Sequence, residues 1–137
     1  MNMIKKLLAA LAISAGMLAL SGCASESTIE ESSVERGQSQ SFSASIESVE
    51  AAAIATLSDL GLNLKNTTRA ADGVVTLVFS KPVSAFSWGE VGKIVISGSP
   101  STTVVTVVSS KRVAFQITGT TQVTFSEQVF SGISNHL

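Results

Sequence analysis

The second half of this chain is a succession of short β-prone runs, and their spacing limits the folds open to it. Residues 74–80, 91–97, 102–109 and 112–118 are rich in Val, Ile and Thr, which are side chains that favour strands. The runs follow one another at spacings of about ten residues. Parallel strands need a longer crossover between them. The spacing therefore predicts an antiparallel meander.

Alternation within the runs indicates which sides of the sheet are buried. In the last run Val113, Phe115 and Ile117 alternate with polar or small residues, a pattern typical of a sheet with one solvated face. Asp72-Gly73 precedes the first run and is a strong hairpin-turn signal. Shorter strands are predicted at residues 41–44, as an edge strand, and at 62–65.

Two stretches have the period of a helix instead. Between residues 46 and 60, apolar side chains recur at every third or fourth position, which is typical of one buried helical face. Ser45 precedes this stretch as a suitable N-cap, and Gly61 follows it where a left-handed residue ends a helix. The predicted face consists of Ile46, Val49, Ala53, Leu57 and Leu60.

The second helix is predicted at the C-terminus. Thr124 and Glu127 match a capping box, with Thr124 as the N-cap and Glu127 at the third helical position. Its apolar stripe consists of Phe125, Val129, Phe130, Ile133 and Leu137. We expect this stripe to lie on the same sheet face as the first helix. The predicted fold class is therefore α+β, with two layers. It places an N-terminal and a C-terminal helix on one face of an antiparallel sheet of about five to six strands, in a single domain over residues 41–137.

The N-terminal 22 residues differ from the rest. Lys5 and Lys6 precede residues 7–20, a run of 14 residues without a charge. A membrane-spanning helix needs about 20 apolar residues. A basic start, a short apolar run and small residues after it instead indicate a secretory signal peptide over residues 1–22. The alternative is a short buried helix of the mature domain.

The end of this segment carries a motif. Leu20-Ser21-Gly22-Cys23 resembles a bacterial lipobox. The resemblance implies that a diacylglyceryl group joins the sulfur of Cys23, that cleavage follows before Cys23, and that the new amine is acylated. In Gram-negative lipoproteins an Asp after this Cys signals inner-membrane retention, and Ala24 at this position favours the outer membrane. The alternative is a free thiol beside an ordinary cleavage site.

Residues 23–40 are predicted to be the lipidated Cys and a flexible tether, with a short helix around Ile29 to Val34 as the alternative. The segment holds Glu26, Glu30, Glu31 and Glu35 and no aromatic residue, so it buries too little apolar surface to offset the entropy of ordering. Glu30 and Glu31 could be a metal-binding pair, but no third ligand is in register. Once Lys5 and Lys6 leave with the signal, seven basic residues face ten acidic ones, and the net charge is near −3.

The helix and the glycine after it support a family resemblance. Residues 45–49 (SIESV) and 55–62 (ATLSDLGL) resemble a family of small bacterial lipoproteins of unknown function (DUF3568-like). That family combines a lipobox, a helix that ends in Leu-Gly, several strands and a C-terminal helix. The resemblance implies this fold and this location only. The segment 81–90 departs from the family by its greater length.

No catalytic or metal site is predicted, and no cofactor is expected. His136 is the only histidine, and its place next to the C-terminus suits a helix end better than catalysis. Among the acids of the domain, Glu90 alone has no evident structural role, and phosphate-binding, dinucleotide-binding and calcium-loop motifs are absent. With 14% charged residues and a net charge of −1, the chain lacks the basic excess of a nucleic-acid binder.

Two features suggest contact with a partner. Phe86 and the single Trp, Trp88, lie in a connection punctuated by Pro and Gly, and exposed aromatic residues there would favour a partner or ligand contact. The alternative is that they cover the open edge of the core. The sheet face away from the helices is the second feature, with Val74, Val78, Val105 and Val107 or their neighbours expected on it.

These observations predict a lipid-anchored protein without enzymatic activity of its own. We expect it on the periplasmic face of the outer membrane, as a structural or interaction module that contacts another envelope protein or a second copy of itself. The alternative function is a binding module for a small apolar or lipid-like ligand between the helices and the sheet. An enzyme is a third hypothesis, which would need a titratable group beside Glu90 in a cleft.

Overall fold

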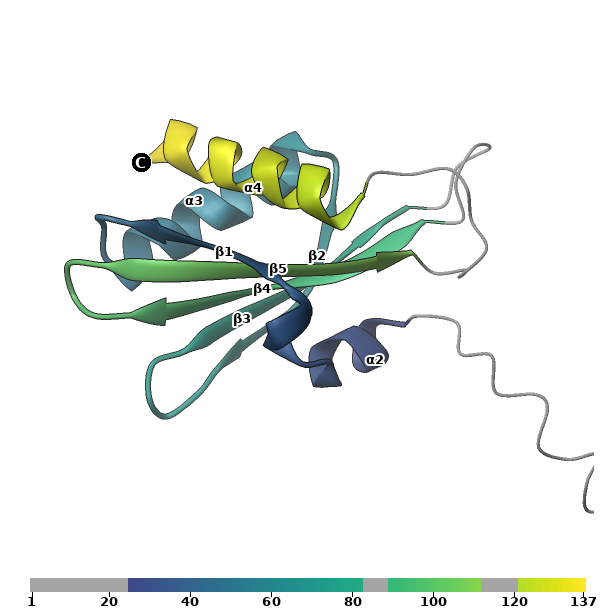
Figure 1. The fold of residues 1–137 in the computed structure, drawn as a ribbon, viewed down its shortest axis with the longest axis horizontal. Helices are drawn as coiled ribbons and strands as arrows, with labels where there is room; N and C mark the ends of the chain where they lie inside the picture. The colour runs from purple at the N-terminus through teal and green to yellow at the C-terminus, as the bar shows by residue number, and fades with distance from the viewer. Residues whose placement is uncertain (1–24, 83–88, 112–120) are drawn as a thin grey trace, which may run out of the picture.

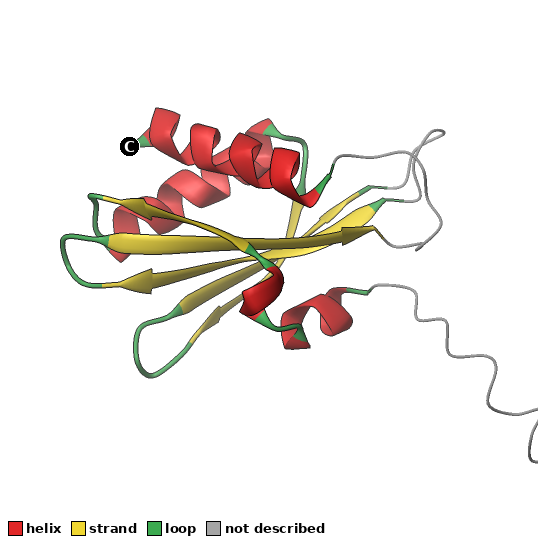
Figure 2. Ribbon diagram, viewed as in Figure 1, coloured by secondary structure: helices red, strands yellow, loops and turns green. Residues whose placement is uncertain are grey.

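A computed structural model describes residues 25–82, 89–111 and 121–137 of the chain (Figure 1). The elements in chain order are α2 (Glu26–Glu31), the 3-10 helix η1 (Val34–Arg36), β1 (Gln38–Phe42), α3 (Ile46–Asp59), β2 (Asn63–Arg69), β3 (Val75–Lys81), β4 (Glu90–Gly98), β5 (Thr103–Lys111) and α4 (Gln122–His136). The expected α+β class is confirmed: α3 and α4 lie together on one face of one antiparallel sheet (Figure 2).

The described sheet has five strands in the order β1-β5-β4-β3-β2. Strands β2 to β5 form the predicted meander, each paired antiparallel with the next. β1 closes the other edge by pairing with β5, where Gln38 lies opposite Val107. The strand predicted over residues 112–118 lies outside the described residues.

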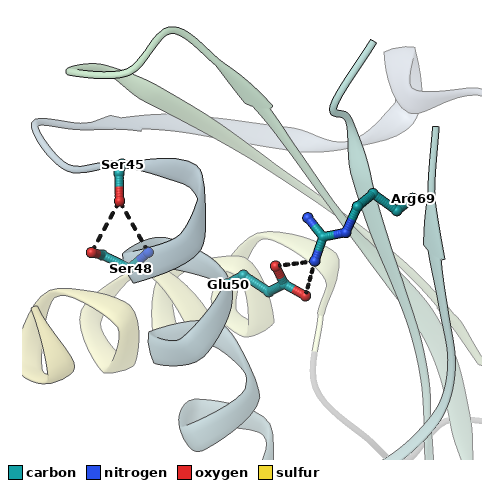
Figure 3. Close-up of polar contacts among 4 residues, drawn as sticks. All are labelled: Ser45, Ser48, Glu50 and Arg69. Atoms are coloured by element: carbon teal, nitrogen blue, oxygen red, sulfur yellow. Dashed lines mark hydrogen bonds and ion pairs between the residues drawn. The ribbon is translucent and has the colours of Figure 1, made fainter. Parts of the chain in front are cut away.

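Helix α3 begins and ends as its sequence predicts. The Ser45 side chain accepts a hydrogen bond from the Ser48 backbone N–H at 3.2 Å, which satisfies one of the free donors of the first turn (Figure 3). Gly61 follows the helix with φ +68°, where a residue with a side chain would be strained. The predicted turn at Asp72-Gly73 is also present, with Gly73 at φ +85° and the Asp72 carboxylate accepting from the backbone N–H of Val74.

The core fills the space between this helix pair and the sheet. Its largest described side chains come from both layers, and the rings of Phe79 on β3 and Phe125 on α4 lie 5.4 Å apart between centroids. The two helices also meet closely. A Cβ atom on Gly132 would lie 2.3 Å from the Cγ2 atom of Thr56. The buried cluster includes Val49, Ala53, Leu57, Leu77, Ile94, Ile96, Val105, Val107, Val129 and Ile133.

Helix α4 starts earlier than predicted. Thr121 is the N-cap, and its side chain accepts from the backbone N–H of Thr124 at 3.2 Å. The capping box predicted at Thr124 and Glu127 is therefore wrong. Thr121 and Thr124 are both suitable N-caps, because the side chain of each could accept from the backbone N–H three positions later. The sequence therefore offers two competing helix starts. The earlier start adds a turn that brings Gln122 against β5, where its side-chain carbonyl accepts from the Ser109 backbone N–H at 2.7 Å.

The segment predicted as a flexible tether is largely structured. Residues 26–31 form α2 and residues 38–42 form β1, so the expectation of a coil over residues 24–40 is wrong for these parts. The physical reason is that both parts borrow stability from the sheet: β1 pairs with β5, and α2 packs on the sheet face opposite α3 and α4 (Figure 1). Composition alone does not report such docking.

The outer edge strand β2 is longer and more polar than predicted. All seven of its residues are exposed, and a register shift interrupts its pairing between Leu64 and Asn66. Arg69 joins the strand to α3 through an ion pair with Glu50, at 2.7 Å between Nη2 and Oε2 (Figure 3). Charges and a bulge on an edge strand discourage pairing with another sheet. In the described part of the chain, no helix is long and apolar enough to cross a membrane.

Candidate functional site: the second face of the sheet

Helix α2 covers part of the sheet face that α3 and α4 leave open. Ile29 is the apolar residue at its centre, and only 4% of it is exposed. It packs with one residue from each of three strands, Val78, Val91 and Val108, as a second small core. Several strands carry Val on both faces, and this cluster shows that α2 covers part of the second, apolar face.

A buried lysine holds the end of this helix. Lys93 lies on the central strand β4, with 4% of the residue exposed. Its Nζ atom donates to the backbone carbonyl of Glu30 at 2.9 Å and also to that of Ser32. The last carbonyls of a helix have no partner within it, and a cation beside them also interacts favourably with the helix dipole. Lys93 therefore caps the C-terminal end of α2 from the sheet below.

Burial lowers the pKa of the Lys93 ammonium group below its ordinary value of 10.5, and the charge of Glu30 opposes this by raising it. The physical cause of the lowering is the loss of water around the charge. Lys93 was not among the residues predicted to be functional from the sequence. The available signal was a single lysine inside an otherwise apolar β-prone run.

The Glu30 side chain reaches across to the edge strand. Its Oε1 atom accepts hydrogen bonds from Asn66 Nδ2 at 3.2 Å and Thr68 Oγ1 at 3.3 Å, both on β2. Among the described residues, no group of three or more His, Cys, Asp or Glu side chains could hold a metal ion. The structure thus gives Glu30 a role in docking α2 to the sheet.

The connection from α2 to β1 also lies close against the sheet. A Cβ atom on Gly37 would lie 2.7 Å from the Thr106 Cγ2 atom and 2.8 Å from the Val107 carbonyl oxygen. A residue with a side chain at this position would push η1 away from β5. Gly37 is therefore a close-approach glycine that lets α2, η1 and β1 follow the sheet surface in one continuous path.

No described residue of another element covers the remaining part of the second face. Its half-buried residues have hydroxyl or Val side chains and alternate along the strands with residues of the main core. They are Thr76, Val95, Ser97, Val104 and Thr106. Val78 lies on this second face as predicted, but Val105 and Val107 face the helices and belong to the main core. Their neighbours Val104 and Val108 lie on the second face instead, as the prediction allowed, and Val74 precedes β3 rather than lying in it. Alternate residues of a strand face opposite sides of the sheet. Where Val occupies consecutive positions, the sequence does not indicate which of the two alternating sets faces the helices.

The other residues singled out by sequence lie in different places. Cys23, Phe86 and Trp88 are outside the described residues, so lipidation of the first and partner contact of the other two remain predictions. One residue, Ala24, separates Cys23 from Ser25, and the Ser25 side chain caps α2 by accepting from the Thr28 backbone N–H.

Glu90 is buried, with 5% of it exposed. It lies in register between Lys81 on β3 and Lys111 on β5. A cross-strand neighbour of opposite sign, here Lys81, stabilises a sheet, so Glu90 has a structural place that its sequence did not reveal. His136 lies at the end of α4, with Nε2 2.7 Å from Asp59 Oδ2, and both side chains are well exposed.

Surface grooves are present beside the helices. One of about 490 Å³ runs between α3 and α4 and is lined by Thr56, Leu60, Glu127, Gln128, Gly132 and Asn135, among others. It opens to solvent and is lined by mixed polar and apolar residues, unlike an enclosed apolar ligand cavity.

Comparison with known proteins adds no relative. No family model matches the chain, and neither the curated proteins nor the solved structures contain a significant match. The site must therefore be interpreted from its own residues.

Proposed function

We propose that this protein is a lipid-anchored module of the bacterial cell envelope, attached through Cys23 to the periplasmic face of the outer membrane and acting by contact rather than by catalysis. The observation that carries the proposal is the only cysteine of the chain, which follows Leu20-Ser21-Gly22 at the end of an uncharged run. A basic start, a short apolar run and small residues are typical of an export signal, and the resemblance of residues 20–23 to a lipobox implies acylation of Cys23. Several acyl chains on one residue anchor a protein stably, whereas a single chain binds marginally.

Metabolic labelling tests the anchor. The full chain is produced in a Gram-negative host fed with an alkyne fatty acid, beside a Cys23→Ser variant. We expect label and membrane association for the parent chain, and neither for the variant, which keeps its signal peptide unprocessed. Equal labelling of both chains would refute the anchor.

The module part of the proposal is supported by the open part of the second face. Val95 and Val104 lie there half-buried beside Thr and Ser side chains, on a sheet whose other face packs against α3 and α4. Flat surfaces of this kind suit contact with another protein, either a different envelope protein or a second copy.

Site-specific photocrosslinking in intact cells tests this contact. A photoreactive amino acid replaces Val95 on the open face, and in a matched control it replaces Ser58, which is exposed on α3. We expect a discrete adduct from position 95 and none from position 58. Adducts of equal yield at both positions, or none at either, would contradict a contact through this face.

A further inference from the structure

We propose that the docked helix α2 gives the anchored domain a fixed orientation on the bilayer, with the end of the sheet nearest to Ser25 facing the lipid headgroups. This inference depends on the proposed acylation of Cys23. We call this part of the molecule the anchor end, and its described residues that reach the surface are Ser25, Lys81, Pro82, Gln122 and Val123.

The first argument is the length of chain between anchor and fold. Ser25 caps the first described helix, and it is two positions after Cys23. Two Cα–Cα steps span at most about 7.6 Å. If residues 25–40 were a coil, the domain could move some 20 Å from the membrane. Because α2 is docked, that freedom is absent.

The second argument is that α2 is fixed to the sheet by contacts of several kinds. Ile29 is buried between three strands, the Lys93 ammonium group binds the end of the helix, and the Glu30 carboxylate binds β2. The helix is short, but these contacts fix both its position and its direction. The anchor therefore pulls on the whole domain rather than on a loose segment.

The third argument is the direction in which α2 points. Its C-terminal carbonyls lie over Lys93, and its N-terminal end points toward the end of the sheet where β3 and β5 finish and β4 begins (Figure 1). Helix α4 begins at the same end, because Gln122 hydrogen-bonds to Ser109 and Val107 near the end of β5. Val123 next to it is an apolar residue that is 50% exposed, and an apolar side chain at a bilayer interface is removed from water.

The opposite end of the sheet then points away from the membrane. It carries the β2–β3 turn at Asp72-Gly73 and the β4–β5 turn at residues 99–102. Strand β4 has nine residues, which corresponds to about 30 Å at 3.3 Å per residue. The partner that fits the anchor end is thus the phospholipid headgroup layer itself.

Energy transfer to a labelled headgroup tests this orientation. The lipidated full chain is inserted in phosphatidylethanolamine–phosphatidylglycerol vesicles that contain a rhodamine headgroup lipid. A donor dye is attached to one introduced cysteine, since the sulfur of Cys23 is already in a thioether. The chain's two prolines offer matched exposed positions: Pro82→Cys lies at the anchor end and Pro100→Cys in the opposite turn.

The expected result follows from the length of the sheet. Because the two positions lie about 30 Å apart along the strands, we expect transfer from Pro82→Cys to be at least about twofold more efficient. Transfer of equal efficiency from both positions, or more efficient transfer from Pro100→Cys, would overturn the proposed orientation.

Two further variants show whether α2 sets the orientation. Insertion of 15 Gly and Ser residues between Ala24 and Ser25 should remove the difference between the two labels, and so should Ile29→Ser, which undocks α2. Val34→Ser, at a residue that is 45% exposed, is the matched control and should preserve the difference. A difference that survives both the insertion and Ile29→Ser would refute the role of α2.

Mass spectrometry of the same samples separates the two proposals. If Cys23 carries no acyl group, the proposed anchor is wrong and the orientation proposal falls with it. If Cys23 is acylated but both labels transfer equally, the anchor stands and only the orientation is wrong.

Discussion

Lys93 is a charged side chain placed where strands usually carry apolar ones. It lies on the central strand β4 and binds two carbonyl groups at the end of α2. A buried ammonium group is costly unless its donors have partners. The lysine therefore ties the helix to the sheet and makes the stability of that contact sensitive to pH.

The first prediction concerns this sensitivity. Because burial lowers the pKa of Lys93 in the folded state, the unfolded chain binds more protons between the folded pKa and 10.5, and the stability contributed at this position rises with pH across that window. Urea unfolding of the parent chain and of Lys93→Met, each at pH 7 and pH 10, measures the effect. We expect the unfolding free energy of the parent chain, relative to that of Lys93→Met, to be higher at pH 10 than at pH 7. An identical pH dependence of the two chains would contradict this prediction.

The second prediction concerns Gly132 on α4. In a helix, alanine is favoured over glycine by about 1 kcal/mol. Here, however, the new Cβ atom would lie 2.3 Å from Thr56 Cγ2, and the Thr56 hydroxyl is bonded to the Ala52 carbonyl at 2.8 Å. Overpacking costs about 1–3 kcal/mol, so we expect Gly132→Ala to destabilise the protein.

Thermal unfolding measures this effect, with Ser134→Ala on the exposed side of the same helix as the control that gains propensity without a clash. The double variant Thr56→Ser/Gly132→Ala removes the nearest contacting atom and should recover part of the loss. Gly132→Ala with a higher melting temperature than the parent chain would show that the two helices separate easily.

Among the elements, α2 is the one whose stability depends most on the rest of the molecule. A helix of six residues is far below the length at which isolated helices form in water. Its order therefore depends on Ile29, on Lys93 and on the bonds of Glu30 to β2. Loss of one of these contacts should release the helix without unfolding the sheet.

The third prediction tests this local release. Removing the apolar side chain in Ile29→Ser forfeits about 1.5–3 kcal/mol of burial, and we expect fast amide exchange across α2 with β3, β4 and β5 still protected. Hydrogen exchange measured by mass spectrometry reports both regions in one experiment. Val34→Ser serves as the control, and slow exchange of α2 in Ile29→Ser would mean that Ile29 does not hold the helix.

The elements also show what the sequence can and cannot predict. Helix α3 was predictable because its cap, its apolar face and Gly61 all indicate the same bounds. The central strands were predictable from their β-branched runs. By contrast, α2 has one apolar anchor among acids, and β2 is exposed along its whole length, so neither has a periodic signal; both depend on contacts that are distant in sequence.

The same distinction applies to the candidate site. Cys23 follows from a local motif and needs no fold to be proposed. Lys93 and Ile29 acquire their roles only when residues about 60 positions apart come together, and no local pattern describes such a pair. The sequence does not distinguish whether Val105 and Val107 or their neighbours lie on the second face, because adjacent Val residues leave the parity of a strand undetermined.

At the scale of the whole molecule, the proposed acylation of Cys23 predicts which membrane carries the domain. The resemblance to Gram-negative lipoproteins links the residue after the acylated Cys to sorting, and here that residue is Ala24. The fourth prediction is that the parent chain fractionates with the outer membrane and that Ala24→Asp moves it to the inner membrane. Density-gradient separation of the two membranes measures this, with Ala24→Ser as the matched control. If Ala24→Asp and the parent chain are found in the same fraction, position 24 does not sort this protein.

Pairing of β1 with β5 also means that β1 cannot join the sheet before β5 has been synthesised. The partners of β1 lie more than 60 positions further along the sequence, so β1 and α2 have no sheet to join until β5 has left the ribosome or the export channel. The segment from α2 to β1 is therefore synthesised well before the strand β5 on which it docks. If Cys23 is acylated during export as proposed, the modifying enzyme meets this region before α2 and β1 can dock on the sheet.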